Sequence, residues 1–383
     1  MLTTIIIFII ILGILVFVHE FGHFIVAKKS GMVVEEFGFG FPPRIIGLQK
    51  VDGKWKWVWG KSLRNELPPT PSLEKRGGQQ PTIYSINAIP LGGFVRILGE
   101  NNEYQNHPGS FINKGFWPRF FTLVAGVLMN VILAWVLLSV GFGIGIPTAI
   151  QSASELPPQA TFYDQHPGIA EVTINTPAEK AGMKPEDSIL SIDDKDFKQI
   201  PDIQNYIQSH PGQPLNFKIL RGSQTISLSI IPEASAEGKG LIGVGLATFG
   251  KLKYPWALTF TEGAKSTGVA LVNIVLGLYH VIHDRIGLAA IGGPVKIAAL
   301  VGQARQAGVA ALLSLTVMLS LSLAVLNILP IPALDGGRVL FLIIEKLRGK
   351  KNNQKVEQAF NTLGFALLLV LMVIVTVHDI IRR

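Results

Sequence analysis

The chain carries the stretch His19-Glu20-Phe21-Gly22-His23 within an otherwise apolar run from Leu2 to Ala27. On a helix, His19 and His23 lie about one turn apart, so both imidazole rings project from the same face. Two imidazoles placed in this way can bind one zinc ion, and Glu20 can reach a water molecule on that metal. The stretch therefore predicts a metal site with a carboxylate base beside it.

The apolar run around this motif is more than 20 residues long, about the length that crosses a hydrocarbon core of roughly 30 Å. Ionisable side chains at that depth are costly, so we expect them to face the protein interior or a water-filled cavity and to act together. The HExxH spacing is a metalloprotease signature. The alternative is a chance group of polar residues near a helix end.

The composition is that of a membrane protein, since 48% of the 383 residues are hydrophobic and only 16% are charged. The absence of cysteine excludes disulfides, thiol nucleophiles and cysteine-ligated zinc. His, Asp and Glu therefore remain as the metal ligands. The formal net charge of +8 fits Lys and Arg on cytoplasmic loops better than a nucleic-acid partner, and no nucleic acid is expected.

Four apolar segments predict a polytopic α-helical membrane protein with about four transmembrane helices. The remaining segments predict a membrane-associated β-hairpin region, an inserted α+β domain and amphipathic interfacial helices. The predicted transmembrane helices cover residues 1–28, 118–146, 304–340 and 355–383. The β-hairpin region covers residues 29–117, the inserted domain 165–248 and the interfacial helices 252–303.

Basic residues indicate how the chain is oriented in the membrane. They are concentrated between Lys28 and Arg119 and again between Lys346 and Lys351, which predicts that both loops are cytoplasmic. Both termini then lie outside, although the C-terminal arginines at 382–383 fit this less well. The motif in the first helix is expected toward the cytoplasmic half of the membrane.

The first cytoplasmic loop contains a strong hairpin signal. Ile45–Lys50 and Lys54–Trp59 flank Asp52-Gly53, a dipeptide that favours a tight turn. Tryptophan alternates with Lys and Val in the second of these strands, which is typical of a one-sided strand at a membrane interface. The Pro- and Gly-rich stretch Leu67–Pro81 that follows is interpreted either as a linker or as a gate.

A second hairpin is predicted nearer the next helix. Thr82–Asn87 and Gly93–Leu98 flank the turn residues Pro90-Leu91-Gly92. An apolar hairpin beside a membrane helix can dip into the bilayer if protein or water satisfies its backbone groups.

The inserted domain has the pattern of a soluble α+β fold. Thr176-Pro177-Ala178-Glu179-Lys180-Ala181-Gly182-Met183, followed by Asp187-Ser188-Ile189-Leu190-Ser191-Ile192, resembles the PDZ domains of bacterial proteases. Gly240-Leu241-Ile242-Gly243-Val244 resembles the peptide-binding loop and strand of a circularly permuted PDZ domain. Such domains add an extended peptide to a sheet edge, so peptide C-termini are hypothesised as ligands. The alternative is a spacer domain that binds no peptide.

A second group of candidate metal ligands follows this domain. His280, His283 and Asp284 have i, i+3, i+4 spacing and could bind a metal. We interpret them instead as polar positions of an interfacial helix within Tyr254–Leu288, because no catalytic base accompanies them.

The third apolar segment ends in Asn327-Ile328-Leu329-Pro330-Ile331-Pro332-Ala333-Leu334-Asp335-Gly336-Gly337. The prolines end the helix and the glycines allow a tight turn, which leaves Asp335 presented on a short loop. A catalytic zinc needs a third protein ligand besides two histidines. Asp335 is the acidic residue placed to supply it. A lone Asp at a helix end is usually a cap, but beside His19 and His23 the ligand is the favoured interpretation.

Four features of the chain together carry a family resemblance. They are HEFGH in the first helix, the PDZ-like insert, Gly292-Gly293-Pro294-Val295, and NILPIPALDGG in the third helix. The chain resembles the site-2 protease family of intramembrane zinc metalloproteases, in particular the bacterial regulator-of-sigma-E protease type with one PDZ domain. The resemblance implies that His19, His23 and Asp335 hold Zn²⁺ and that Glu20 is the general base.

The resemblance also implies two elements that position the substrate. Asn327 is expected to hold the substrate backbone, and the segment Tyr84–Leu98, with Gly92, Gly93 and Phe94, to pair with the unwound substrate. Two departures stand out. Ala125-Gly126-Val127-Leu128-Met129-Asn130 lacks the Gly-Pro of the family's second helix, and the chain has room for one PDZ domain where many relatives have two.

The expected function is regulated intramembrane proteolysis in a bacterial inner membrane, with single-span membrane proteins as substrates. In the resembling family these include anti-sigma factors and remnant signal peptides. The PDZ domain is expected outside the cytoplasm. Two alternatives stay open: a membrane-anchored PDZ adaptor with a silent metal site, and a zinc protease that cuts soluble loops at the cytoplasmic surface.

Overall fold

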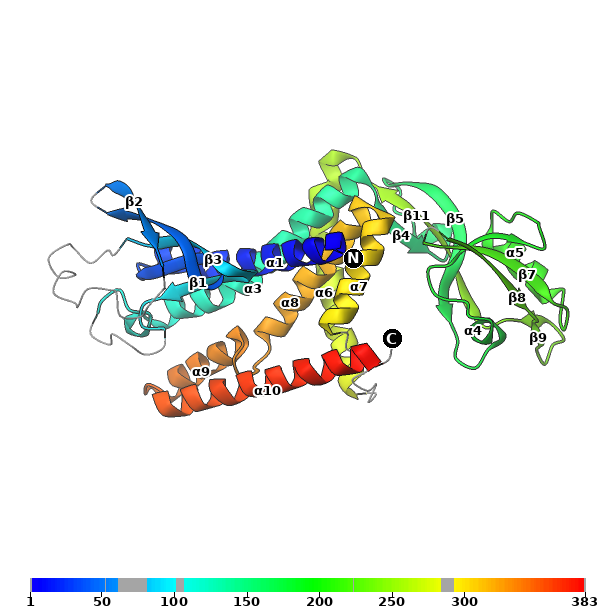
Figure 1. The fold of residues 1–383 in the computed structure, drawn as a ribbon. Coiled ribbons are helices and arrows are strands. Elements are labelled where there is room, and N and C mark those ends of the chain that lie inside the picture. Colours follow the sequence, from blue (N-terminus) through cyan, green and yellow to red (C-terminus); the bar gives the residue numbers. More distant parts are fainter. Residues whose placement is uncertain are drawn as a thin grey trace. The chain divides into compact units, whose positions relative to one another are not determined.

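The computed structural model (Figure 1) describes most of the chain as two compact units. The first unit comprises residues 1–136, 265–301 and 316–383, and the second comprises residues 137–264 and 302–315. The described residues are 2–51, 53–60, 81–100, 107–222, 224–283 and 293–381. The predicted linker at 67–80, Asp52 of the first hairpin, Asp284 and Gly292 lie outside them.

Five helices among the described residues are long and apolar enough to cross a membrane. They are α1 (Leu2–Lys29), α3 (Phe116–Ile144), α6 (Trp256–His283), α8 (Val309–Ile328) and α10 (Gln354–Ile381). The expected number of four is therefore not confirmed. The additional helix is α6, for which the sequence predicts an interfacial position because of its polar residues. In the structure it continues without a break for 28 residues.

The sheet of the first unit confirms the first predicted hairpin. It contains β1 (Val34–Val51), β2 (Lys54–Trp59) and β3 (Ile83–Ile97) in the order β2-β1-β3. Val51 lies opposite Lys54 at the turn, and the pairing of the two strands is antiparallel. The three tryptophans of β2 are all exposed, and so are its two lysines, so the strand is not buried on one side as expected.

The prediction that Thr82–Asn87 and Gly93–Leu98 pair with each other is wrong. Gly38 of β1 lies opposite both Ser85 and Phe94, so the first half of β1 is inserted between the two arms of β3. A Cβ on Gly38 would lie 2.6 Å from side-chain atoms of both these residues, so only glycine fits between the arms. Turn residues indicate that a chain reverses, but they do not indicate which strand pairs beside it.

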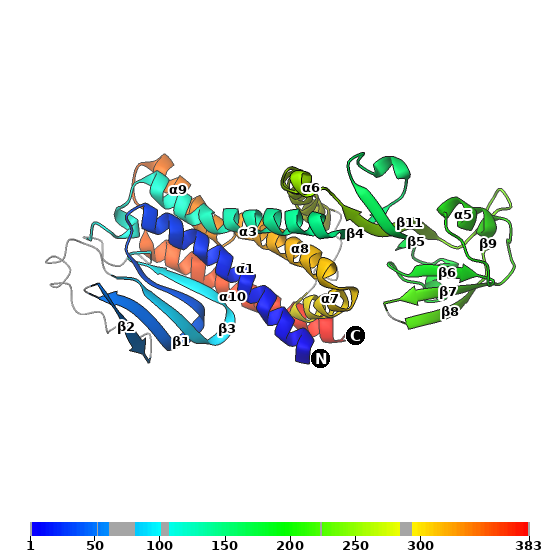
Figure 2. The same cartoon turned by 90° about the horizontal axis from the view of Figure 1, so that it is seen from above.

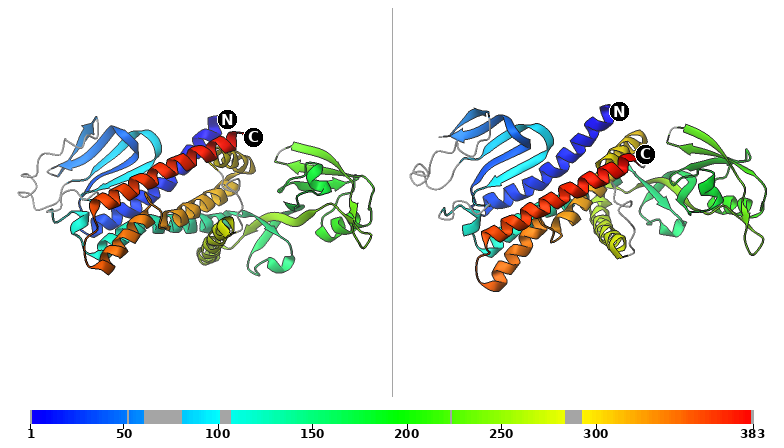
Figure 3. Two further views of the ribbon diagram at one scale, coloured as in Figure 1. Left: turned by 90° about the horizontal axis from the view of Figure 1, so that it is seen from below. Right: turned by 60° about the horizontal axis from the view of Figure 1, so that its bottom comes forward.

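The first unit is completed by α7 (Pro294–Ala307), of which residues 294–301 belong to it, and α9 (Asp335–Arg348). The carboxylate of Asp379, near the end of α10, accepts hydrogen bonds from the backbone N–H groups of Gly293 (3.0 Å) and Lys296 (3.1 Å). It thereby caps the start of α7. After α9, Gly349 adopts a left-handed φ of 63°, and α10 runs back beside α9 (Figure 3).

The second unit holds a six-stranded sheet in the order β4-β11-β5-β6-β7-β8 (Figure 2). This unit contains both strands and helices, as an α+β fold does. The core includes Ile169, Ile192, Ile203 and Phe217, which are fully buried. The main elements are β4 (Ile146–Ile150), β5 (Thr161–Val172), α4 (Pro177–Lys180), β6 (Ser188–Ile192), α5 (Ile200–Gln208), β7 (Leu215–Arg221), β8 (Gln224–Ile230) and β11 (Val244–Lys253).

An ion pair between buried Asp187 and half-buried Arg221 connects two strands of this sheet. Asp187 is fully buried, and its two carboxylate oxygens accept hydrogen bonds of 2.7 Å each from the guanidinium of Arg221. The backbone N–H of Lys184 adds a third at 2.8 Å. The hydrogen bonds to Asp187 raise the pKa of Arg221. The pair joins the turn before β6 to the end of β7. Removing one of the two residues would leave the other without its ion-pair partner.

We predict that Asp187→Asn lowers the local stability of this sheet by about 2 kcal/mol, because the buried carboxylate that accepts three hydrogen bonds becomes a neutral amide with one acceptor oxygen. Asp164→Asn is the control, since the Lys251–Asp164 pair is exposed and such pairs contribute less than about 1 kcal/mol. Native-state hydrogen exchange of the β7 amides in the full-length protein measures both. Equal effects would contradict the assignment.

Candidate metal centre

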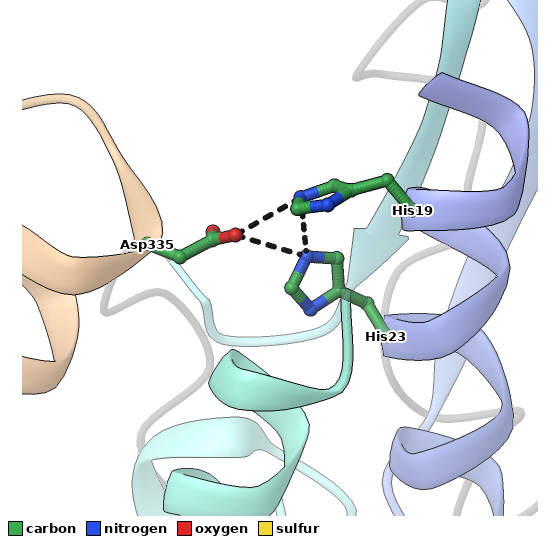
Figure 4. A group of neighbouring side chains, drawn as sticks. All are labelled: His19, His23 and Asp335. Carbon is green, nitrogen blue, oxygen red and sulfur yellow. Dashed lines mark hydrogen bonds and ion pairs between the residues drawn. The ribbon is translucent and has the colours of Figure 1, made fainter. Parts of the chain in front are cut away.

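Three side chains from two distant parts of the chain converge in the first unit (Figure 4). Nε2 of His19 lies 3.0 Å from Oδ2 of Asp335, and Nε2 of His23 lies 3.4 Å from the same oxygen. The two Nε2 atoms are 3.2 Å apart. Among the described residues, no other group of three or more His, Asp or Glu side chains has this metal-binding arrangement.

These separations fit a zinc ion. Tetrahedral ligand atoms about 2.0 Å from a metal lie about 3.3 Å from one another, close to the three observed distances of 3.0, 3.2 and 3.4 Å. Oδ2 of Asp335 is buried and has no hydrogen-bond partner, although buried carboxylates normally have several. Two imidazole nitrogens and a carboxylate oxygen this close to one another form a donor set that suits a divalent cation.

One face of α3 orients the two imidazoles. Nδ1 of His23 lies 2.7 Å from the backbone carbonyl oxygen of Thr122, which can only accept a hydrogen bond. The ring proton of His23 is therefore on Nδ1, and the lone pair of Nε2 is available to a metal. Metal-binding histidines in proteins usually have a hydrogen-bond partner of this kind on their other ring nitrogen.

Asn130 is the corresponding hydrogen-bond partner of Nδ1 in His19. Its amide nitrogen lies 3.3 Å from Nδ1 of His19, while its own Oδ1 is buried without a partner. Rotating the amide by 180° places Oδ1 where it accepts a hydrogen bond from Nδ1–H of His19. That rotation satisfies both groups and leaves Nε2 of His19 for the metal.

Glycines let α1 and α3 approach closely enough for these contacts. A Cβ on Gly126 would lie 2.4 Å from Nε2 of His23 and 2.7 Å from Cε1 of His19. A Cβ on Gly22 would lie 2.3 Å from the carbonyl oxygen of Ala125. These distances are below van der Waals contact, so neither position accepts a larger residue without moving a helix.

Thr122, Gly126 and Asn130 were not among the predicted site residues. Their i, i+4, i+8 spacing in an apolar helix is the signal that could have found them, since it places two polar residues and a glycine on one face. The missing Gly-Pro of the family pattern drew attention to this stretch without indicating its role.

Asp335 is the first residue of α9 rather than part of a loop. Leu334 is the N-cap, and no side chain caps the helix, so the structure offers no support for Asp335 as a simple cap. Gly336 makes this placement possible, because a Cβ there would lie 2.1 Å from the carbonyl oxygen of Leu329. The carboxylate is therefore directed toward the histidines (Figure 4).

Asn327 and Glu20 also lie at this centre. The amide nitrogen of Asn327 is 3.5 Å from Nε2 of His19. Oε2 of Glu20 accepts a hydrogen bond of 3.1 Å from the backbone N–H of Val95 in β3. A Cβ on Gly93 would lie 3.8 Å from Cγ of Glu20, so this arm of β3 runs directly past the candidate base.

The other predicted residues of this segment also pack near α1. A Cβ on Gly92, whose φ is 104°, would lie 2.9 Å from a side-chain atom of Val16. Phe94 sits opposite Gly38 in the sheet. Val95, which holds Glu20, was inside the predicted segment but was not singled out, and no side-chain pattern could reveal a backbone contact.

The remaining predicted residues lie away from the metal centre. His280 and His283 are exposed on α6, and the ring of His283 stacks on Tyr279. In the second unit, β10 (Gly240–Leu241) pairs with β9 (Glu233–Ala234). The carbonyl of Ile242 accepts a hydrogen bond from Ala178, that of Gly243 accepts one from Thr173, and Val244 begins β11.

Comparisons with known proteins agree with this site. The model of peptidase family M50 matches residues 7–59 and 66–371. The zinc metalloprotease RasP of Geobacillus kaustophilus is 29% identical over 461 residues, covering 99% of this chain and 98% of the relative. A candidate zinc metalloprotease of Clostridium acetobutylicum is 30% identical over 385 residues, covering 98% of this chain and 97% of the relative.

The solved structures add a local similarity. The PDZ domain of an SdrC-like protein from Listeria innocua is 27% identical, covers 21% of this chain and 92% of its own, and has a TM-score of 0.20. The similarity is confined to one part of the chain.

Together, the donor set and the relatives define a zinc metalloprotease with several long apolar helices. The chain belongs to peptidase family M50, the site-2 protease family.

We predict that Gly126→Ala lowers the zinc content of the purified protein, because the added methyl group occupies the space of both imidazoles. Gly268→Ala in α6 is the matched control, since a Cβ there meets nothing within 4 Å. Elemental analysis of zinc per chain gives the readout. Full zinc content in Gly126→Ala would show that α1 and α3 are not held as closely as described.

For Asn130→Ala we expect zinc affinity to fall about 10- to 100-fold, the usual cost of removing a residue that orients a metal-binding histidine. Competition with a chelator measures the affinity without any substrate. Asn130→Asp restores an acceptor for Nδ1–H of His19 and should bind more tightly than the alanine variant. If the alanine variant bound zinc as well as the wild type, Asn130 would have no orienting role.

Proposed function

We propose that this zinc metalloprotease cleaves transmembrane segments of single-span membrane proteins. The observation that carries the proposal is the position of the site. His19, Glu20 and His23 lie within α1, a helix long and apolar enough to span the membrane, and both histidines are more than 90% buried. A protease whose metal ligands lie within a spanning helix meets its substrates most readily inside the bilayer.

His19, His23 and Asp335 hold the zinc ion, and Glu20 acts as the general base. When bound, zinc polarises the scissile carbonyl and lowers the pKa of water. Glu20 accepts a proton from the attacking water and passes it to the nitrogen of the leaving amine. The hydrogen bond from the N–H of Val95 holds one carboxylate oxygen of Glu20, which orients the other toward the reacting groups. Asn327 positions the substrate backbone.

A helical substrate must unwind before its peptide bonds become accessible, since its carbonyls are engaged in hydrogen bonds. The arm of β3 that contains Gly92, Gly93 and Phe94 lies beside Glu20. It pairs with β1 on one side. An unwound segment that adds to its other side as a strand recovers part of the lost backbone hydrogen bonding next to the base.

The second unit acts as a PDZ domain that screens substrates outside the cytoplasm. Residues 244–247 of β11 pair with β5, whereas β4 pairs only with residues 248–252. Within the described part of the chain, one edge of 244–247 therefore has no strand partner, which suits the addition of a peptide C-terminus. Gly240, Leu241, Ile242 and Gly243 form the approach to this edge.

The substrate class that fits these features is a remnant left by an earlier cut, such as an anti-sigma-factor-like protein or a signal peptide in a bacterial inner membrane. The basic residues before α3 and after α9 favour a cytoplasmic location for those loops. The site then lies toward the cytoplasmic half of the membrane.

The test compares the wild type with Glu20→Gln on a single-span substrate in lipid vesicles, with mass spectrometry to locate the cut. The variant should retain zinc and lose about 10²- to 10⁴-fold in cleavage rate, the usual contribution of a general base. Glu171→Gln, an exposed carboxylate of the second unit, is the charge-matched control.

Two outcomes would favour the rival functions. Cleavage in a soluble loop rather than within the apolar segment would indicate a protease acting at the membrane surface. No cleavage by the wild type, with substrate binding that survives Glu20→Gln, would indicate a PDZ adaptor with a silent metal site.

We also predict that a helix-breaking Leu→Pro substitution near the cut in the substrate raises its cleavage rate, because it lowers the cost of unwinding. The same substitution far from the cut is the control. An unchanged rate would mean that unwinding does not limit the reaction.

A further inference from the structure

A basic cavity lies at the start of α3, apart from the metal centre. Its volume is about 410 Å³, within the range of small-molecule sites. All of its lining residues belong to the first unit. Its charged lining residues are Lys114, Arg119, Glu345, Lys346, Lys350 and Lys351.

The charge of this cavity is strongly unbalanced. Glu345 is the one carboxylate among its described lining residues, and it already accepts a hydrogen bond of 2.8 Å from Arg119. The lysines at 114, 346, 350 and 351 form no ion pair with any residue that the structure describes. Like charges gathered around one cavity repel each other, so the arrangement is stabilised by an anion.

Two helix ends shape the cavity. The 29-residue helix α3 begins at Phe116, and its N-terminal backbone N–H groups add positive potential. On the other side, α9 ends at Arg348, and Gly349 with its left-handed φ of 63° turns the chain so that Lys350 and Lys351 return over the cavity.

The position of the cavity matches the level of lipid headgroups. It lies at the end of a candidate membrane span, α3, and close to the start of another, α10. Nζ of Lys346 lies 4.4 Å from the ring centroid of Phe116 and 5.5 Å from that of Trp117. Trp117 and Phe121 are exposed beside it, as is typical of aromatic residues at a membrane interface.

We propose that this cavity binds the headgroup of an anionic phospholipid. The phosphate contacts the lysines, and the acyl chains lie along the exposed apolar surface of α3 that begins with Trp117 and Phe121. Basic pockets between transmembrane helices on the cytoplasmic side bind anionic lipids by this chemistry. Since α9 starts at Asp335, the bound lipid also anchors the far end of the helix that carries the third metal ligand.

The test is native mass spectrometry of the purified full-length protein, titrated with phosphatidylglycerol or with phosphatidylcholine of the same acyl chains. The wild type should bind phosphatidylglycerol more tightly. Each lysine near an anionic lipid is worth about a fivefold change in affinity. The triple variant Lys346→Gln, Lys350→Gln, Lys351→Gln should therefore lose at least about tenfold.

The matched control removes three exposed lysines of the second unit, through Lys184→Gln, Lys198→Gln and Lys218→Gln, and should change the affinity less than about twofold. If the triple variant fails to fold, the double variant Lys350→Gln, Lys351→Gln replaces it, since both residues follow the end of α9. A third arm adds glycerol 1-phosphate, which shares the phosphate and lacks the acyl chains, and it should not displace the lipid.

Three results would overturn the proposal. The first is equal binding of phosphatidylglycerol by the pocket variant and the wild type, and the second is equal affinity for phosphatidylcholine. The third is displacement by glycerol 1-phosphate, which would show that the cavity recognises a soluble phosphate rather than a lipid. None of these readouts depends on proteolysis.

Discussion

The convergence of His19, His23 and Asp335 on one point is the constraint on which the first unit depends. Three donor atoms lie within 3.0 to 3.4 Å of one another among apolar helices. Without a cation, this arrangement would bury facing lone pairs and an unpaired carboxylate oxygen, which is unfavourable in a medium of low polarity. The helix packing around it is adapted to that requirement, through Gly22 and Gly126 where α1 meets α3.

The supporting shell shows how the fold specifies the chemistry of each group. A backbone carbonyl of α3 fixes the proton of His23, and Asn130 can do so for His19. A backbone N–H of β3 holds Glu20. These contacts come from α3 and from the sheet, so the motif in α1 depends on segments that are distant in sequence. Asp335 depends in turn on the glycine that follows it.

Much of this architecture was predictable from the sequence, and the parts that were not share a physical cause. The convergence of His19, His23 and Asp335 could be predicted, because ionisable residues are costly within an apolar helix and usually act together there. The first hairpin followed from alternating residues beside a turn dipeptide. The insertion of β1 between the two arms of β3 at Gly38 could not be predicted, because strand order depends on long-range packing. The contact of Val95 with Glu20 uses a backbone N–H and leaves no sequence signal, and α6 combines span length with an amphipathic composition.

The most direct test of the central claim is X-ray absorption spectroscopy at the zinc edge of the purified protein. The geometry predicts one zinc per chain with two imidazoles and oxygen ligands at about 2.0 Å, and the loss of one imidazole from the spectrum of His23→Ala. Thiolate ligands from the chain are impossible, because it has no cysteine. A spectrum with fewer than two imidazoles in the wild type, or an unchanged spectrum in His23→Ala, would contradict the assignment of His19, His23 and Asp335 as the metal centre.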